Sequence, residues 1–358
     1  MSDVAASGRD IKLGDPVRHP SVWYGADLAR HDDWLHQLSA AEIAELANAT
    51  ATVKARGLPI TEITRDDFVL PKLGSVLAGI RAELVDGRGV AMLRGVPVAT
   101  LSREDAAITY WGIGAHIGEA VSQNHMGHVL GHVKDLGDSA DDVNTRGYRS
   151  HADLPFHNDI GAELIGLLCL HGSKSGGLSS VASAAAIHNE MLKCDPDLVA
   201  ALAEPLYRDR RGEVPNGKDP YYPMPVFNYH AGHLTVCYVR RFIESAQRFK
   251  ELPRLTDRQV AAMDMMMEMA YSEDLRLDIS FNPGDIQFVN NLTTLHTRTE
   301  YEDYPEPERK RHLLRLWLAA PDGWPLPDAF YERYGATVET GRPAGIDASR
   351  RVAPLEAE

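Results

Sequence analysis

From about residue 120 onward, the chain consists mainly of short apolar segments separated by turn residues. Apolar and polar residues alternate in several of these segments, as is typical of antiparallel strands that bury one face. The pattern predicts strands over residues 127–136, 155–170, 178–184, 224–230, 233–240, 277–281, 285–290 and 312–319. The segments 277–281 and 285–290 flank the turn sequence Asn-Pro-Gly-Asp, and we predict that they pair as a hairpin.

The earlier part of the chain has helical periodicity. Ser39 and Glu42 form a capping-box pattern before apolar residues, which predicts a helix from about residue 40 to Gly57. Other segments predict helices over residues 72–86, 102–116, 185–204 and 256–271, and a strand over 89–96. Helices followed by many short strands predict a mixed α+β, mainly β fold: a jelly-roll or double-stranded β-helix, a cupin-like barrel with flanking helices.

We expect three regions along the chain. Residues 1–84 form an N-terminal helical region packed on the barrel, and residues 85–330 form the jelly-roll domain with helical insertions. Residues 331–358 form a C-terminal tail, which we expect to be poorly ordered from about residue 338. Residues 1–20 are polar and are expected to form a loose arm.

Charge and composition exclude several classes of partner. The net charge of −14 opposes binding to nucleic acid or to an anionic membrane. The sequence contains neither a signal-peptide pattern at its start nor a run of 18 apolar residues that could cross a bilayer. Its 3 cysteines have unrelated spacings, which fits a reducing compartment. We therefore expect a cytoplasmic protein without membrane or nucleic-acid partners; a homo-oligomer is compatible with this composition.

His157 and Asp159 are two residues apart in a segment with a strand-like pattern. Residues i and i+2 of a strand point to the same face, so both side chains can reach one point. Two histidines with one carboxylate form the facial triad of non-haem Fe(II) oxygenases. The best candidate for the second histidine is His296, which ends the motif Asn-Asn-x-x-x-Leu-His. His151 and Asp153 have the same spacing, and either pair can arise by chance among 15 histidines.

Two further segments carry groups that could bind a carboxylate. Arg311 and Arg315 follow His296 and lie four residues apart, so on a strand they face the same side. The planar fork of arginine suits a carboxylate, although solvated arginines on an edge strand fit the pattern equally well. Gly176-Gly177-Leu178-Ser179 places a hydroxyl after a turn, where Ser179 could bind a carboxylate or serve ordinary turn chemistry.

These four motifs, in this order, resemble the TauD/TfdA (taurine dioxygenase-like) family of Fe(II)/2-oxoglutarate-dependent dioxygenases, and the chain is also similar to clavaminate synthase. The resemblance covers roughly residues 85–325. It implies that His157, Asp159 and His296 are the catalytic Fe(II) ligands, and it favours His157 over His151 because the Gly-Gly turn follows at the right distance.

The resemblance also implies a binding site for the co-substrate. Arg311 would bind the distal carboxylate of 2-oxoglutarate with help from Ser179, and Arg315 would lie nearer the substrate or the C1 carboxylate. Two departures affect Ser179: the family's Gly-Gly-Asp-Thr turn reads Gly-Gly-Leu-Ser here, and the interval from His157 is short.

The implied reaction uses O2 to convert 2-oxoglutarate to succinate and CO2, while an unactivated C–H bond of a small molecule is oxidised, most often by hydroxylation. Asp159 argues against halogenation, because halogenating relatives lack this carboxylate. Candidate substrate contacts are the loop residues Gln123, Asn124, Tyr148 and Arg149. Spare arginines hint at a substrate with an anionic group.

Two other functions are compatible with the same residues. A cupin-like hydrolase or isomerase could bind Zn(II) through His157, Asp159 and His296. Alternatively, the barrel could bind a ligand without turnover. The pair Arg311 and Arg315 discriminates against the hydrolase, which has no need of a buried dicarboxylate clamp.

Overall fold

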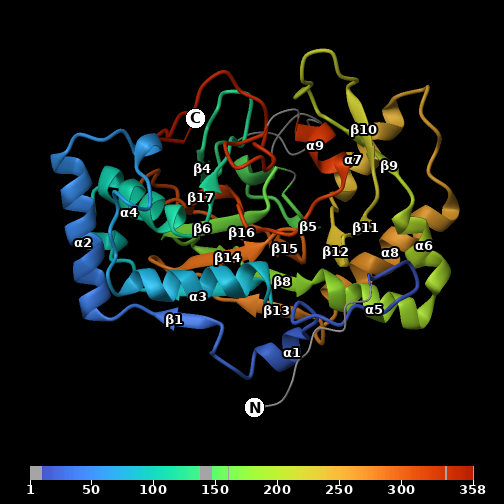
Figure 1. Cartoon of the computed structure of the whole chain (residues 1–358), viewed down its shortest axis with the longest axis horizontal. Coiled ribbons are helices and arrows are strands. Elements are labelled where there is room, and N and C mark those ends of the chain that lie inside the picture. Colours follow the sequence, from blue (N-terminus) through green and yellow to red (C-terminus); the bar gives the residue numbers. More distant parts are fainter. Residues whose placement is uncertain (1–9, 138–146, 160, 335–336, 358) are drawn as a thin grey trace.

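Two facing β-sheets form the centre of the fold (Figure 1). The computed structural model describes residues 10–137, 147–159, 161–334 and 337–357. In the larger sheet the strand order is β1 (Leu35–Gln37), β2 (Val90–Arg94), β14 (Ile286–Asn290), β6 (Leu164–His171), β17 (His312–Ala319) and β3 (Glu119–Ala120), with β4 (Leu130–Val133) also paired to β17. In the smaller sheet the order is β13 (Arg276–Ile279), β8 (Ser179–Ser183), β15 (Thr294–Arg298) and β5 (Leu154–His157).

An apolar core lies between the two sheets. Val90, Ile165 and Val289 of the larger sheet and Val181 and Leu277 of the smaller sheet belong to one buried cluster. The sheets therefore pack face to face, although their described strands do not join by hydrogen bonds into one closed barrel. The predicted mixed α+β, mainly β fold with flanking helices is confirmed by these two facing sheets and the helices around them.

Helices cover the outer faces of both sheets. The helices α2 (Ala40–Ala55), α3 (Leu73–Val85) and α4 (Arg103–Ala115) share an apolar core with the larger sheet. The helices α5 (Ala184–Cys194), α6 (Pro196–Ala203) and α8 (Asp257–Tyr271) share another with the smaller sheet. Figure 1 shows α2 and α4 at one end of the molecule and α5, α6 and α8 at the other.

Smaller elements complete the described chain. Three two-stranded sheets consist of β9 (Leu206–Asp209) with β10 (Tyr221–Met224), β11 (Phe227–His230) with β12 (His233–Val236), and β7 (Ser175–Gly176) with β16 (Tyr301–Glu302). The short helices are α1 (Gly25–Leu28), α7 (Arg240–Ser245), α9 (Asp328–Tyr334) and the 3-10 turns η1 (Ile60–Glu62), η2 (Val98–Thr100), η3 (Gly147–Arg149) and η4 (Ala246–Arg248). None of the helices in the described ranges is long and apolar enough to cross a membrane.

Local capping signals located the starts of α2 and α8 correctly. The Ser39 and Glu42 side chains form the expected capping box at the start of α2, and Thr256 forms another at the start of α8. The helix predicted over residues 185–204 is divided into α5 and α6. The reason is that Asp195 leaves the helical conformation, and its side chain accepts hydrogen bonds from the first turn of α6, which begins at Pro196.

The predicted hairpin over residues 277–290 is wrong. Strand β13 pairs with β8 in the smaller sheet, whereas β14 pairs with β2 and β6 in the larger sheet. The turn between them carries the chain from one sheet to the other. Leu277 and Ile279 face the inter-sheet core, whereas Ile286 and Phe288 pack in the core between the larger sheet and its helices. Strand β14 is buried on both faces, so the alternating pattern identified buried residues but neither the shared face nor the pairing partners.

The two ends of the described chain are tied to the sheets. Strand β1 pairs in parallel with β2, which places residues 35–37 at the edge of the larger sheet. We expected a poorly ordered tail from about residue 338, but Gly345 and Val352 form β-bridges and the buried Arg342 pairs with Glu163. The division into regions at residues 84 and 330 stays a prediction, and residues 1–9 of the expected arm lie outside the described ranges.

Candidate active site

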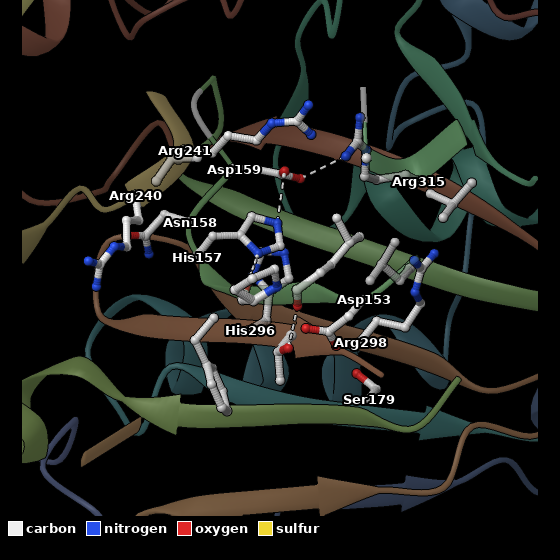
Figure 2. Close-up of a pocket in the computed structure, with 18 of the residues that line it drawn as sticks. Asp153, His157, Asn158, Asp159, Ser179, Arg240, Arg241, His296, Arg298 and Arg315 are labelled. Carbon is white, nitrogen blue, oxygen red and sulfur yellow. Dashed lines mark hydrogen bonds and ion pairs between the residues drawn. The ribbon is translucent and has the colours of Figure 1, made fainter. Parts of the chain in front are cut away.

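The structure brings His157, Asp159 and His296 together. His157 on β5 and His296 on β15 are direct cross-strand partners, with ring centroids 4.4 Å apart. Asp159 follows β5, and its Oδ1 atom lies 3.9 Å from His157 Nε2. One ligand atom from each residue lies within 4.8 Å of the others, so a single metal ion could bind all three (Figure 2).

Asp159 is held in one orientation by two donors on β17. Its Oδ2 atom accepts hydrogen bonds from Trp317 Nε1 at 2.7 Å and from Arg315 Nη1 at 3.0 Å. Burial alone would raise the pKa of Asp159, but the charge of Arg315, the two histidines and the Trp317 bond outweigh it and lower the pKa. The carboxylate is therefore ionised, and Oδ1 faces His157.

Both imidazoles are neutral and suited to a metal. Burial lowers the pKa of His157, and burial together with the nearby His157 lowers that of His296 to about 3. His157 Nδ1 lies 2.7 Å from the Pro155 carbonyl oxygen; donation of its proton there leaves Nε2 for a metal. His296 Nδ1 is buried and has no hydrogen-bond partner in the described chain, so the protein alone does not satisfy this ring. Two neutral imidazoles and a carboxylate fit Fe(II).

Two buried asparagines fix the backbone that carries the ligands. Asn291 Oδ1 accepts a hydrogen bond from the Asp159 N–H group at 2.8 Å, and its Nδ2 atom donates to the Ala162 carbonyl at 2.7 Å. Asn158 Nδ2 donates to the carbonyls of Asn291 and Thr294, which connects the segment after β5 to the start of β15. The Asn-Asn-x-x-x-Leu-His motif thus positions both ends of the triad.

A cavity of about 350 Å³ adjoins the triad. Arg311, Leu313, Arg315 and Trp317 contribute to its wall, whereas Leu314 packs on the outer face of the same strand. This alternation explains why β17 is buried along its whole length. Arg311 and Arg315 are therefore buried residues at the cavity wall, and the alternative prediction that they are solvated arginines on an edge strand is wrong.

One part of the cavity wall offers unsatisfied hydrogen-bond donors. Arg311 is 6% exposed, and its Nη1 atom has no hydrogen-bond partner in the described chain. Burial lowers the pKa of Arg311. Ser179 also lines the cavity; its Oγ donates to Gln287 Oε1 at 3.0 Å, and the buried Gln287 Nε2 has no described partner. These groups could satisfy a carboxylate.

The Gly-Gly turn leaves room for Arg311. Gly176 and Gly177 both have positive φ, at 71° and 69°, a conformation that favours glycine. A Cβ atom on Gly177 would lie 3.0 Å from Ser173 Oγ and 3.3 Å from Arg311 Nε. The two glycines therefore let the backbone of the turn approach the Arg311 guanidinium closely. This holds although Leu-Ser follows them here in place of the family's Asp-Thr.

Arg298 is a cavity residue that the sequence reasoning missed. It follows His296 by two residues on β15, so it points to the same face, and this spacing could have identified it. Its Nη1 atom donates to the Ser150 carbonyl at 3.1 Å, and Nη2 donates to that of Ala152. Burial, followed by the charge of Arg311, lowers its pKa to about 10.

The four loop residues suggested as substrate contacts lie elsewhere or are incompletely described. Gln123 accepts a hydrogen bond from Arg315 Nε at 2.8 Å and donates to the Arg315 carbonyl at 2.9 Å, so it holds Arg315 in place. Asn124 Oδ1 accepts hydrogen bonds within its own turn. Arg149 belongs to η3 and is not among the cavity-lining residues, and the side chain of Tyr148 lies outside the described part.

The alternative pair His151 and Asp153 does not join the triad. His151 Nδ1 lies 3.5 Å from Asp135 Oδ2, away from the metal ligands. Asp153 lines the cavity near Arg298, and burial raises its pKa.

Known sequences resemble the chain over most of its length. The profile of the family described as "Taurine catabolism dioxygenase TauD, TfdA family" matches residues 55–317. FR-33289 synthase of Streptomyces rubellomurinus is 33% identical over 321 residues, which cover 88% of this chain and 94% of the relative. The taurine hydroxylase-like protein SAT17 of Stachybotrys chartarum is 31% identical over 316 residues, covering 86% and 80%.

Solved structures show the same fold at lower identity. A structure of asparagine oxygenase in complex with Fe(II), 2S,3S-3-hydroxyasparagine and succinate has a TM-score of 0.61 and 17% identity, covering 80% of this chain and 93% of that one. The non-heme iron oxygenase OrfP in complex with Fe, succinate and (3R,4R)-dihydroxy-L-Arg has a TM-score of 0.62 and 15% identity, covering 86% and 99%. The fold, the sequence match and the triad together place the chain in the TauD/TfdA family, as an Fe(II)- and 2-oxoglutarate-dependent dioxygenase.

Proposed function

We propose that this enzyme hydroxylates an unactivated C–H bond of a small molecule, with His157, Asp159 and His296 as its Fe(II) ligands. One mole each of 2-oxoglutarate, O2 and substrate would give succinate, CO2 and the hydroxylated product. The observation that carries the proposal is the convergence of the triad on the wall of a cavity that also contains the buried Arg311.

Each group near the metal has a distinct task. Fe(II), when bound, supplies the redox chemistry that couples oxidation of 2-oxoglutarate to oxidation of the substrate. Arg311 binds the distal carboxylate of 2-oxoglutarate, and Ser179 assists by turning its O–H group from Gln287 Oε1 to that carboxylate. Arg315 and Trp317 hold Asp159 Oδ2, so that Oδ1 remains for the metal.

The relatives support a small-molecule substrate. The asparagine oxygenase and OrfP structures contain hydroxylated amino acids together with iron and succinate. At 17% and 15% identity these structures share the fold with this chain, and the amino acid itself is not carried over. We place the enzyme in the cytoplasm because Cys169, Cys194 and Cys237 are all free thiols.

The proposal is tested by Fe(II)-dependent release of succinate from 2-oxoglutarate, with a matched pair of histidine variants. The variant His157→Ala loses a metal ligand and should release no succinate above the metal-free background. The variant His151→Ala removes a histidine with the same local spacing but no place in the triad, and should retain wild-type release. Equal losses in both variants, or succinate release without Fe(II), would contradict the assignment.

A further inference from the structure

Residues 342–355, which we call the strap, cross the loop that connects β3 to β4 (Figure 1). Gly345 forms a parallel β-bridge with Ser122 near the start of this loop, and Val352 forms another with His128 near its end. The strap is therefore joined to the loop at two places by its main chain.

Buried contacts hold both ends of the strap. Arg342 and Glu163 are both buried, and Arg342 donates from Nε to Glu163 Oε2 at 3.0 Å and from Nη2 to Oε1. At the other end, the Pro354 carbonyl oxygen lies 2.9 Å from His132 Nε2 on β4. Leu355 packs against the core between the larger sheet and its helices. The strap is thus a fixed part of the fold.

Two glycines allow the strap to lie close to the loop. Gly345 has a φ of 78°, and a Cβ atom there would lie 2.2 Å from the Ser122 carbonyl oxygen. Gly127 of the loop has a φ of 81°, and a Cβ atom there would lie 1.8 Å from the Arg350 carbonyl oxygen. A side chain at either position would therefore push the strap and the loop apart.

The loop under the strap carries Gln123, whose buried side chain holds Arg315. Its Nε2 atom donates to the carbonyls of Arg315 at 2.9 Å and Val129 at 3.2 Å, and its Oε1 atom accepts from Arg315 Nε at 2.8 Å. A Cβ atom on Gly131 would lie 2.3 Å from Gln123 Oε1, so the amide is closely packed against β4. Arg315 Nη1 in turn donates to Asp159 Oδ2 at 3.0 Å. A continuous series of contacts thus runs from the loop to the metal-binding carboxylate.

A second series of contacts begins at Glu163, the partner of Arg342. The Glu163 carbonyl accepts a hydrogen bond from the Asn291 N–H group at 2.8 Å, and Asn291 Oδ1 accepts one from the Asp159 N–H group at 2.8 Å. All residues of the strap are described by the structure, and none of them lines the cavity. The strap can therefore affect the reaction only through these contacts.

We propose that the strap positions the Asp159 carboxylate for the metal, with Gln123 as the positioning residue that connects them. This inference rests on the proposed function, because it takes Asp159 as a ligand of Fe(II). Removal of a group that orients a metal ligand typically weakens metal binding 10- to 100-fold. Gln123 acts one step further away, through Arg315, and Trp317 also holds Asp159 Oδ2. We therefore expect its loss to weaken Fe(II) binding about three- to tenfold.

A matched pair of glycine variants separates this positioning role from a general loss of stability. Gly345→Ala places a methyl group against the Ser122 carbonyl and displaces the strap. Gly341→Ala is the control, because Gly341 has nearly the same φ, 79°, but its Cβ atom would meet no atom within 4 Å. Both variants strain the backbone, and only Gly345→Ala moves the strap away from the loop.

The Kd for Fe(II) is measured anaerobically by competition with a chromogenic chelator. The temperature is chosen well below the Tm of each variant, with folding checked by circular dichroism. Destabilisation alone leaves this Kd unchanged as long as nearly all molecules are folded, because the apparent affinity scales with the folded fraction. The Kd therefore reports the geometry of the site and not the stability of the protein.

Two further variants test the proposal without the added methyl group. Gln123→Leu keeps the size of the side chain and removes its hydrogen bonds to Arg315 and Val129. Arg342→Gln combined with Glu163→Gln loosens the start of the strap without leaving an unpaired buried charge. We expect the Kd for Fe(II) to rise about three- to tenfold in these two variants and in Gly345→Ala, and to stay at the wild-type value in Gly341→Ala.

The outcomes separate this inference from the proposed function. An unchanged Kd in Gln123→Leu, or in the folded strap variants, would overturn the positioning role. Equal losses of affinity in Gly341→Ala and Gly345→Ala would also overturn it. Failure of the wild-type protein to bind Fe(II) at all would instead contradict the proposed function.

Discussion

Replacement of Trp317 by phenylalanine tests whether the groups behind Asp159 matter for metal binding. The change keeps a large apolar ring in the inter-sheet core but removes the 2.7 Å hydrogen bond from Nε1 to Asp159 Oδ2. A hydrogen bond to a charged group contributes about 1.5–3 kcal/mol. Because Arg315 still holds the same oxygen, we take the lower end, about 1.5 kcal/mol, which corresponds to an Fe(II) affinity about tenfold weaker.

The chain contains a matched control for this substitution. Trp324 is also buried, at 8% exposure against 2% for Trp317, and its Nε1 atom donates to Asp86 Oδ1 at 3.1 Å, away from the triad. Fe(II) affinity is measured anaerobically by competition with a chromogenic chelator for wild type, Trp317→Phe and Trp324→Phe. Unchanged affinity in Trp317→Phe, or an equal loss in Trp324→Phe, would refute the role assigned to this hydrogen bond.

Three further predictions follow from the same contacts. Arg311→Lys keeps the charge but loses the planar fork of the guanidinium, so the Kd for 2-oxoglutarate in a calorimetric titration should rise about tenfold or more. The control Arg309→Lys changes an exposed arginine and should leave this Kd unchanged. Equal Kd values in the two variants would count against the role of Arg311. Asn158→Ala removes three buried hydrogen bonds, which join its side chain to Asn291, Thr294 and Tyr238. The free energy of unfolding in urea should therefore fall by about 3 kcal/mol. The control Asn48→Ala changes an exposed residue and should lower it by about 0.5 kcal/mol or less. Burial holds the pKa of His296 at about 3 against 6.5, so between these values the unfolded chain binds a proton that the folded chain does not. The stability of metal-free protein should therefore fall as the pH drops through this window, and urea titrations at about pH 5 and about pH 7.5 should show a weaker dependence for His296→Gln.

The three proposed metal ligands could be predicted from a spacing and a resemblance. The i, i+2 spacing suggested a shared target for His157 and Asp159, although β5 ends at His157 and Asp159 lies just beyond it. The resemblance of the four ordered motifs to the TauD/TfdA family selected His296 as their partner. The cross-strand pairing of His157 with His296 was not readable from spacing, since these residues are far apart along the chain. Only the pairing of β5 with β15 brings the two rings to 4.4 Å.

The contacts around the ligands were less accessible from sequence. Gln123 and Arg315 are separated by 192 positions, and no local pattern indicates that one side chain holds the other. The expected hairpin failed for the same reason, because alternation identifies a buried face without specifying which strand lies beside it. Arg298 and Trp317 could have been found, since each follows a predicted site residue by two positions on a strand.

The central claim is tested most directly by the visible absorption of the anaerobic complex. Metal-free protein is mixed with Fe(II) and then with 2-oxoglutarate, and the broad charge-transfer band of the chelated co-substrate is recorded. The account predicts a band in wild type and in His151→Ala, and none in His157→Ala. A wild-type protein that binds Fe(II) but forms no band with saturating 2-oxoglutarate would contradict the account at its central step.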